Sequence, residues 1–131
     1  MIRRFLLILL LSSASILAYA ADASSPVGVW RTIDDKSGKE KSLVRITEVN
    51  GEFRGTIEKL FREPHEDQNP NCEKCTGDKK NKPVIGMVIM TGLKHDGEMY
   101  SGGEILDPAN GKTYKCKTWL EDKGNLAQIQ V

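Results

Sequence analysis

Short stretches that alternate apolar and polar residues follow one another along most of the chain, separated by residues that favour turns. Residues 27–33 predict a first strand, and residues 42–49 and 52–61 are the first two stretches that alternate. A period of two residues is typical of strands that are buried on one face. Asn50-Gly51 lies between these two stretches and predicts a tight hairpin, because both residue types tolerate the positive φ angles of a type I′ turn.

The second half of the chain continues the pattern. Residues 83–93 are apolar and fit either a strand or a short helix, because periodicity alone does not distinguish the two. Further strands are predicted at 98–106, 112–121 and 126–131. Strands at this spacing, joined mostly by hairpins, predict an all-β fold, an antiparallel meander that forms a small barrel or half-barrel.

A long polar segment, residues 62–82, interrupts the strands and carries two prolines and two cysteines. Its length exceeds that of a hairpin connection, so we interpret it as an ordered or functional loop. The single fold therefore has one conspicuous insertion between its third and fourth strands.

The first twenty residues have the pattern of a cleaved secretory signal. Arg3 and Arg4 precede a continuous apolar run over residues 5–11, and Ala18-Tyr19-Ala20 has the small-x-small form of a cleavage site. The run is too short to span a membrane, which takes about 20 apolar residues. We therefore expect a signal at 1–20, a flexible leader at 21–26 and one β domain at 27–131, in a periplasmic or secreted protein without a membrane span.

The charge balance argues against nucleic acid as a partner. The chain has 19 basic and 18 acidic residues, and loss of Arg3 and Arg4 leaves 17 basic residues and a net charge of −1. Nucleic-acid-binding domains carry a clustered basic face instead.

Several segments resemble the bacterial DUF2147 family over nearly the whole mature chain, and the most specific of them runs from Gly102 to Tyr114. The resemblance implies a small exported protein with a lipocalin-like barrel and no established activity. The Gly28-x-Trp30 pair is also similar to the start of the first lipocalin strand. The residues that match the family pattern are Gly28, Trp30, Gly86, Gly102, Gly103, Asp107, Pro108, Gly111 and Tyr114.

The family pattern usually continues past the position of Val131 with an Arg-Gly-Tyr segment and a closing strand. Here the chain stops at Val131, which predicts an incomplete barrel with an open final edge strand. Such an edge can pair with another chain. We therefore expect either a truncated product or self-association through that edge.

Cys72-x-x-Cys75 is the motif that bears most directly on chemistry, and three outcomes are open besides free thiols. A Cys72–Cys75 disulfide is favoured in an exported protein and would stabilise the fold by about 2 kcal/mol in the chain-entropy model, whereas a Cys75–Cys116 pairing would contribute about 4 kcal/mol. The choice depends on geometry that the sequence does not supply. A zinc site built from His65 and the three cysteines is the third outcome.

The other polar candidates fit structural roles. Asp107, in Asp-Pro-Ala-Asn-Gly, initiates a turn by accepting backbone N–H bonds. Gly102-Gly103, beside Glu104, indicate a bend in a strand or the close approach of a ligand or another strand. His95 is expected in a solvated turn, and Cys116 on a buried strand face. The residues form no recognisable catalytic set and imply no cofactor.

Three functions remain in view. The first is a non-enzymatic binding protein that holds a small apolar or amphipathic molecule at the barrel mouth. The second is a protein-interaction module that acts through the cysteine loop or the open edge. The third is a redox or metal-handling protein built on Cys72 and Cys75.

Overall fold

The computed structural model describes residues 2–4, 25–34, 36–121 and 125–130. These residues form antiparallel strands and one short 3-10 helix in the loop between β4 and β5. The elements are β1 (Ile2–Arg4), β2 (Gly28–Ile33), β3 (Glu40–Val49), β4 (Glu52–Leu60), η2 (Gly77–Lys79), β5 (Val88–Asp96), β6 (Met99–Asp107), β7 (Lys112–Glu121) and β8 (Asn125–Gln130).

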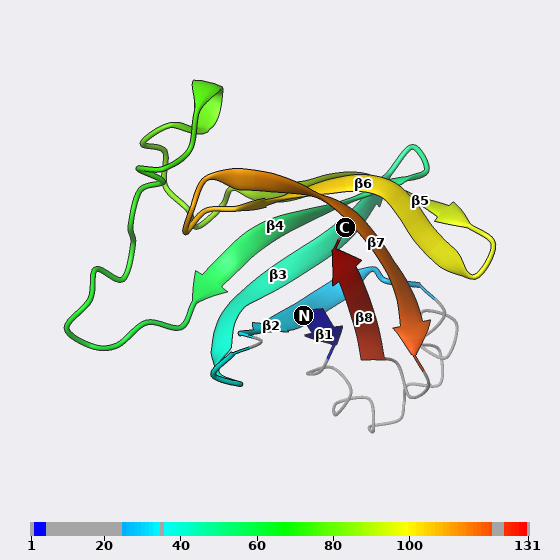
Figure 1. Ribbon diagram of the computed structural model, residues 1–131, viewed down its shortest axis with the longest axis horizontal. Coiled ribbons are helices and arrows are strands. Elements are labelled where there is room, and N and C mark those ends of the chain that lie inside the picture. Colours follow the sequence, from blue (N-terminus) through cyan, green and yellow to red (C-terminus); the bar gives the residue numbers. More distant parts are fainter. Residues whose placement is uncertain (1, 5–24, 35, 122–124, 131) are drawn as a thin grey trace.

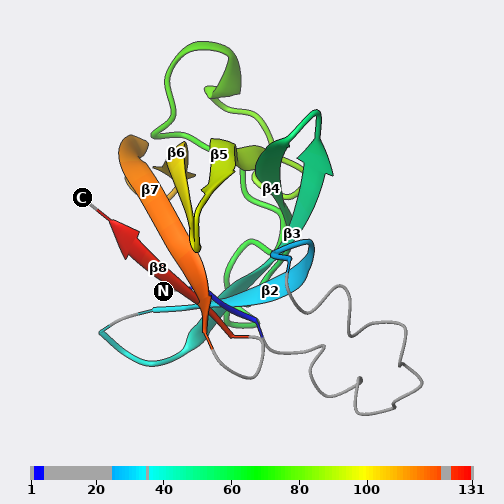
Figure 2. The ribbon, with the colours of Figure 1, turned by 90° about the vertical axis from the view of Figure 1, so that its right-hand side faces the viewer.

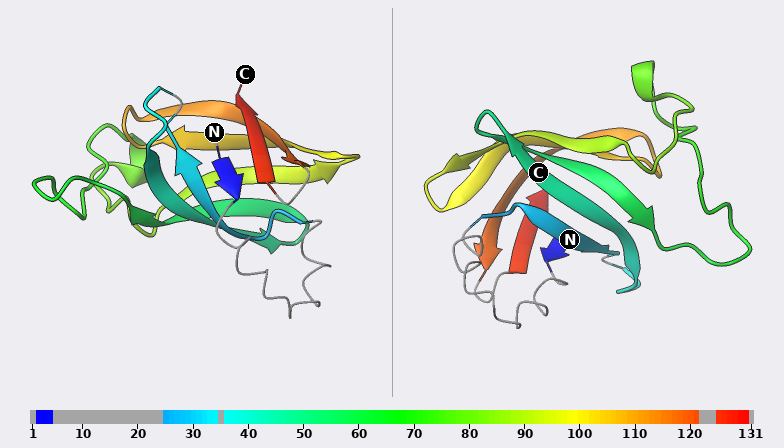
Figure 3. Two further views of the ribbon diagram at one scale, coloured as in Figure 1. Left: turned by 90° about the horizontal axis from the view of Figure 1, so that it is seen from below. Right: turned by 180° about the vertical axis from the view of Figure 1, so that it is seen from behind.

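The strands form one sheet in which each strand pairs with its neighbours in the sequence, in the order β1 to β8. The sheet curls so strongly that its two end strands, β1 and β8, come into contact (Figures 1 and 2). The views from below and behind show the same curled sheet, with β1 beside β8 (Figure 3). The predicted all-β meander in a curled half-barrel is confirmed.

The predicted hairpin between residues 42–49 and 52–61 is present as β3 and β4. Asn50 and Gly51 have φ angles of 53° and 84°, the positive values that a type I′ turn requires. Along β4 the buried positions are Phe53, Gly55 and Ile57, which alternate with more exposed residues. The period of two thus sets which face of the strand enters the core.

The open choice at residues 83–93 is resolved as a turn followed by a strand. β5 begins at Val88, and the preceding residues make irregular backbone bonds. The Gly86 N–H donates to the Ile57 carbonyl at 2.7 Å, and the Ile57 N–H donates to the Met87 carbonyl at 3.0 Å. These bonds attach the end of the long loop to β4.

Trp30 on β2 lies at the centre of the core and is fully buried. Its indole N–H donates to the Pro26 carbonyl at 2.6 Å, which fastens the segment before β2 over the interior. Ile46 on β3 and Leu93 on β5 are also fully buried. The described side chains on the inner face of the sheet therefore pack into one continuous core.

The Gly102-Gly103 pair lies at an irregularity in the pairing of β6 with β7, between Tyr100 and Gly103. A Cβ atom at Gly103 would lie 2.9 Å from the Thr91 carbonyl oxygen and 3.1 Å from the Leu93 Cα. These distances are too short for a side chain. The pair therefore serves as the predicted bend and the predicted close approach of a neighbouring strand.

β1 falls within the predicted signal, whereas residues 5–20 and most of the predicted leader lie outside the described residues. The signal and its cleavage stay predictions. Cleavage after Ala20 would remove β1 and leave β2 as an end strand of the sheet. The predicted turn at 122–124 and Val131 also lie outside the described residues, while the last predicted strand is present as β8.

Candidate functional site

A disulfide joins Cys72 to Cys75, with their Cα atoms 5.4 Å apart. This settles the cysteine pairing, and it leaves Cys116 as a buried free thiol on β7. The sulfurs of Cys72 and Cys75 no longer offer thiolate ligands, so the alternative Cys₃His zinc site does not form. Within the described part of the chain, no group of three or more metal-binding side chains comes together.

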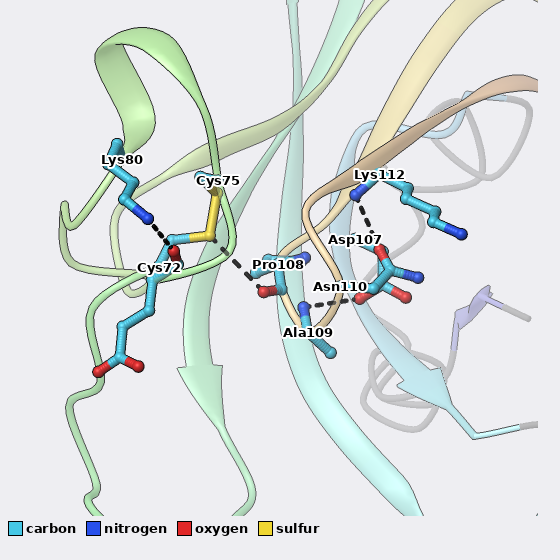
Figure 4. Close-up of a disulfide and its surroundings, with 9 residues drawn as sticks. Cys72, Cys75, Lys80, Asp107, Pro108, Ala109, Asn110 and Lys112 are labelled. Atoms are coloured by element: carbon cyan, nitrogen blue, oxygen red, sulfur yellow. Dashed lines mark hydrogen bonds between the residues drawn. A yellow bond between two sulfur atoms is a disulfide. The ribbon is translucent and has the colours of Figure 1, made fainter.

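The disulfide is enclosed by the backbone of its own loop. The Cys72 N–H donates to the Lys82 carbonyl at 2.7 Å, and the Asn81 N–H donates to the Cys72 carbonyl at 2.8 Å. The ammonium group of Lys80 donates to the Glu73 carbonyl at 2.5 Å (Figure 4). The loop is thus an ordered element that projects from the sheet and carries η2 at its tip (Figure 1).

The turn between β6 and β7 has the structure that its sequence predicts. The Asp107 carboxylate accepts a bond from the Ala109 N–H at 2.9 Å, and the Asp107 carbonyl accepts one from the Gly111 N–H at 2.8 Å. Asp107 is therefore a turn initiator. An Asn-Gly pair in such a turn is expected to supply positive φ angles. Gly111 has a φ of 75°, whereas Asn110 does not have a positive φ, and its side chain accepts a bond from the Lys112 N–H at 2.8 Å.

This turn packs directly against the disulfide. The Sγ of Cys72 lies 3.6 Å from the Pro108 carbonyl oxygen (Figure 4), a contact rather than a donated hydrogen bond, because a disulfide sulfur carries no proton. A Cβ at Gly111 would overlap the Lys74 carbonyl group. The two most characteristic segments of the sequence, Cys72–Cys75 and Gly102–Tyr114, therefore meet at one place.

A hollow of about 300 Å³ opens at this junction. Its floor is the sheet, and Thr91, Glu104 and Thr113 in that floor are exposed residues on β5, β6 and β7. Because they alternate with buried Met90 and Ile105, the floor belongs to the outer face of the sheet. The loop supplies the opposite wall through Cys75, Thr76, Asp78 and Lys79. We name this space the loop hollow.

The loop hollow has both polar and apolar walls. Glu104 and Leu106 lie two residues apart on β6, so both side chains face the same side of the sheet. Val88 and Ile89 of β5 extend the apolar part of the wall. No ion pair to Glu104 is present among the described residues, although Lys115 is its neighbour across β6 and β7. The site therefore offers a carboxylate, hydroxyl groups and an aliphatic surface together.

A second hollow of about 240 Å³ lies at the β6–β7 irregularity and shares Glu104 with the first. It is lined by Gly102, Gly103, Lys115 and Cys116. Burial raises the pKa of the Cys116 thiol to about 11, so this sulfur is a protonated core group at neutral pH. Cys116 is thus the small buried residue that the sequence predicts.

The remaining predicted residues do not line the loop hollow, and some of them stabilise elements next to it. Gly28 is in β2, Trp30 is in the core, and Gly86 is part of the attachment of the loop to β4 described above. The Tyr114 hydroxyl accepts a bond from the Asn110 side chain at 3.0 Å and steadies the β6–β7 turn. His95 is in β5 rather than in a turn, where its ring stacks on Tyr100 at 4.7 Å between centroids. The local sequence around His95 favours a turn, but the cross-strand contact with Tyr100 keeps His95 in the strand.

Replacing both disulfide cysteines, Cys72→Ser with Cys75→Ser, is expected to lower the free energy of unfolding by about 2 kcal/mol, because the short closed loop regains its freedom in the unfolded chain. Urea unfolding measures the loss. The double variant should also expose the loop to limited proteolysis near Lys79 and Lys80. Cys116→Ser serves as the control for a thiol outside the loop, and protection of the loop in the double variant would contradict a clamping role for the disulfide.

Among the described residues, no helix is long and apolar enough to cross a membrane. No curated protein matches this chain. Among solved structures, protein HP1028 from Helicobacter pylori, described as belonging to the lipocalin family, is similar with a TM-score of 0.68. The two sequences are 20% identical, and the similarity covers 81% of this chain and 71% of the other. This likeness supports the lipocalin-like fold.

The family comparison concerns the sequence itself. The model of the family described as DUF2147, "Uncharacterized protein conserved in bacteria", matches residues 28–128. The matched range spans β2 to β7 and most of β8, and it includes the disulfide, the β6–β7 turn and the residues that line the loop hollow. The chain therefore belongs to the DUF2147 family of uncharacterised bacterial proteins.

Proposed function

We propose that this protein is an exported, non-enzymatic binding protein that holds a small amphipathic molecule in the loop hollow. The observation that carries the proposal is the hollow itself, in which a disulfide-clamped loop faces three strands of a lipocalin-like sheet. Small-molecule sites in proteins are concave, preformed and lined by apolar surface with a few placed polar groups. The loop hollow is concave and preformed, its volume is at the small end of the usual range, and its lining is more polar than that of most such sites, which favours an amphipathic ligand over a purely apolar one.

The site differs in position from the barrel mouth that the sequence suggests. The described inner face is filled by the core around Trp30, Ile46 and Leu93, whereas the loop hollow lies on the outer face. Lipocalin-like barrels in general act by binding, which supports a non-enzymatic role. Export is supported by the basic and apolar pattern of residues 1–20 and by the disulfide, a bond typical of oxidising compartments.

The burial of the disulfide argues against a redox function. Cys72 and Cys75 are 1% and 2% exposed, so a thiolate or a partner protein would have to open the loop before reaching either sulfur. Catalytic disulfides are partly exposed for this exchange. We infer that the bond serves to shape the wall of the hollow.

An interaction module is the second candidate function, and the projecting loop favours it. Residues 77–82 at the tip are all exposed, and the disulfide keeps the loop ordered without a partner. A rigid exposed loop loses little entropy on binding a protein. The two functions differ in which surface is occupied, the tip of the loop or the hollow at its base.

Native mass spectrometry of the protein purified from the bacterium that makes it tests the binding function. We expect a discrete small-molecule adduct on the wild-type protein. Thr113→Trp should abolish the adduct by filling the hollow, while the matched control Thr47→Trp on the exposed part of β3 should retain it. A bare wild-type protein, or an adduct that survives Thr113→Trp, would contradict binding in the loop hollow, and a bound protein chain would favour the interaction module.

A further inference from the structure

We infer that the ligand of the loop hollow is a cationic amphiphile, a primary amine or similar cation on a short apolar chain. This inference rests on the proposed binding function and specifies its chemistry. Three observations support the inference. The lining has more carboxylates than ammonium groups, and its charged and apolar residues are at different places in the hollow. Glu104 also has no ion pair among the described residues.

The charged groups around the hollow favour a cation. Its lining contains the carboxylates of Asp78 and Glu104 and a single ammonium group, that of Lys79. Glu104 is on a strand in the floor, held between β5 and β7 by its pairing with Thr91 and Lys115. Lys79 is in the exposed last turn of η2, where its long side chain can extend into solvent. The fixed charge of the site is therefore negative.

Glu104 has the hydrogen-bonding capacity that an ammonium ligand needs. A carboxylate accepts several hydrogen bonds, and no ion pair or side-chain hydrogen bond to Glu104 is found among the described residues. Thr91 and Thr113, on the strands to either side, line the same hollow and supply hydroxyl acceptors. Charge-assisted hydrogen bonds from an ammonium group to such a carboxylate are about twice as strong as neutral ones.

The apolar wall fixes the other half of the ligand. Leu106 follows Glu104 on the same face of β6, and Val88 and Ile89 of β5 are also among the residues that line the hollow. A molecule whose cation contacts Glu104 can therefore lay an aliphatic chain along Leu106 and β5. An anionic head group at the same place would face the Glu104 carboxylate, whereas Lys115, the cross-strand neighbour of Glu104, is exposed and is not among the residues that line the loop hollow. The charges of the lining therefore favour a cation over an anion of the same length.

The test uses hexylamine and hexanoate as probes of equal length and opposite charge, added to the full-length protein and followed by shifts of the backbone amide resonances in NMR spectra. Hexylamine should shift the amides of Thr91, Glu104 and Thr113 with a dissociation constant at least about tenfold below that of hexanoate. Glu104→Gln should weaken hexylamine binding by about tenfold. Lys79→Gln should strengthen it, because a like charge is removed.

The control variant is Glu98→Gln, which removes the same charge from the exposed turn between β5 and β6, outside the hollow. It should bind hexylamine as the wild type does, and equal melting temperatures of the two glutamine variants would exclude a folding effect. Hexanoate binding as tightly as hexylamine, or an unchanged affinity in Glu104→Gln, would overturn the inferred charge and leave the binding function standing. Absence of shifts with both probes would overturn the binding function as well.

Discussion

Gly111→Ala is expected to lower the free energy of unfolding by about 2–5 kcal/mol and to separate the cysteine loop from the β6–β7 turn. Gly111 has a φ of 75°, where an L-residue costs roughly 1–2 kcal/mol. The new methyl group would also overlap the Lys74 carbonyl, whose carbon lies 2.6 Å from the Cβ position. Overpacking of this kind costs typically 1–3 kcal/mol. Urea unfolding measures the total.

Gly97→Ala is the matched control for this substitution. Gly97 has a similar φ of 68°, but a Cβ atom there would meet nothing within 4 Å. The difference between the two variants therefore isolates the contact with the cysteine loop from the backbone cost. Gly111→Ala should also weaken ligand binding in the loop hollow, because the wall and the floor move apart. Equal losses of stability in the two variants would show that the loop moves aside freely.

The strands and turns could be predicted because their causes are local. Alternation defines the buried face of β4, and the positive φ angles at Asn50 and Gly51 follow from those two residue types. The Asp107 turn follows from a side chain that bonds to its own backbone two residues on. The misjudged details, His95 and Asn110, are places where a contact from another residue competes with local preference.

The disulfide pairing and the loop hollow depend on contacts that local patterns do not contain. Chain entropy favours Cys75–Cys116, but the backbone bonds around Cys72 hold it beside Cys75. The hollow takes Lys79 from the loop and Thr91, Leu106 and Thr113 from three strands. None of these residues stands out in the sequence. Glu104 could be singled out by its glycine neighbours, although its place in the floor of a hollow depends on how the loop folds back.

Replacement of the fully buried Trp30 is expected to cause the largest loss of stability. Trp30→Ala should lower the free energy of unfolding by about 3–5 kcal/mol, because a fully buried indole is replaced by a cavity. The Pro26 carbonyl also loses its hydrogen bond from the indole N–H. Trp30→Phe should separate the two effects, since it keeps most of the ring volume and leaves the carbonyl without its partner, at a cost of about 1–3 kcal/mol.

Trp119→Ala on β7 is the control for the same change in side chain, because Trp119 is half-buried and outside the main cluster of buried residues. Both variants are compared by urea unfolding, with the slope of the transition as a check that the same surface is exposed. A loss at Trp119 equal to that at Trp30 would contradict a special contribution of the central cluster to stability. A much smaller loss at Trp119 would show that the packing around Trp30 contributes most to stability. Because Trp30 does not line the loop hollow, residues of the hollow can then be replaced without unfolding the protein.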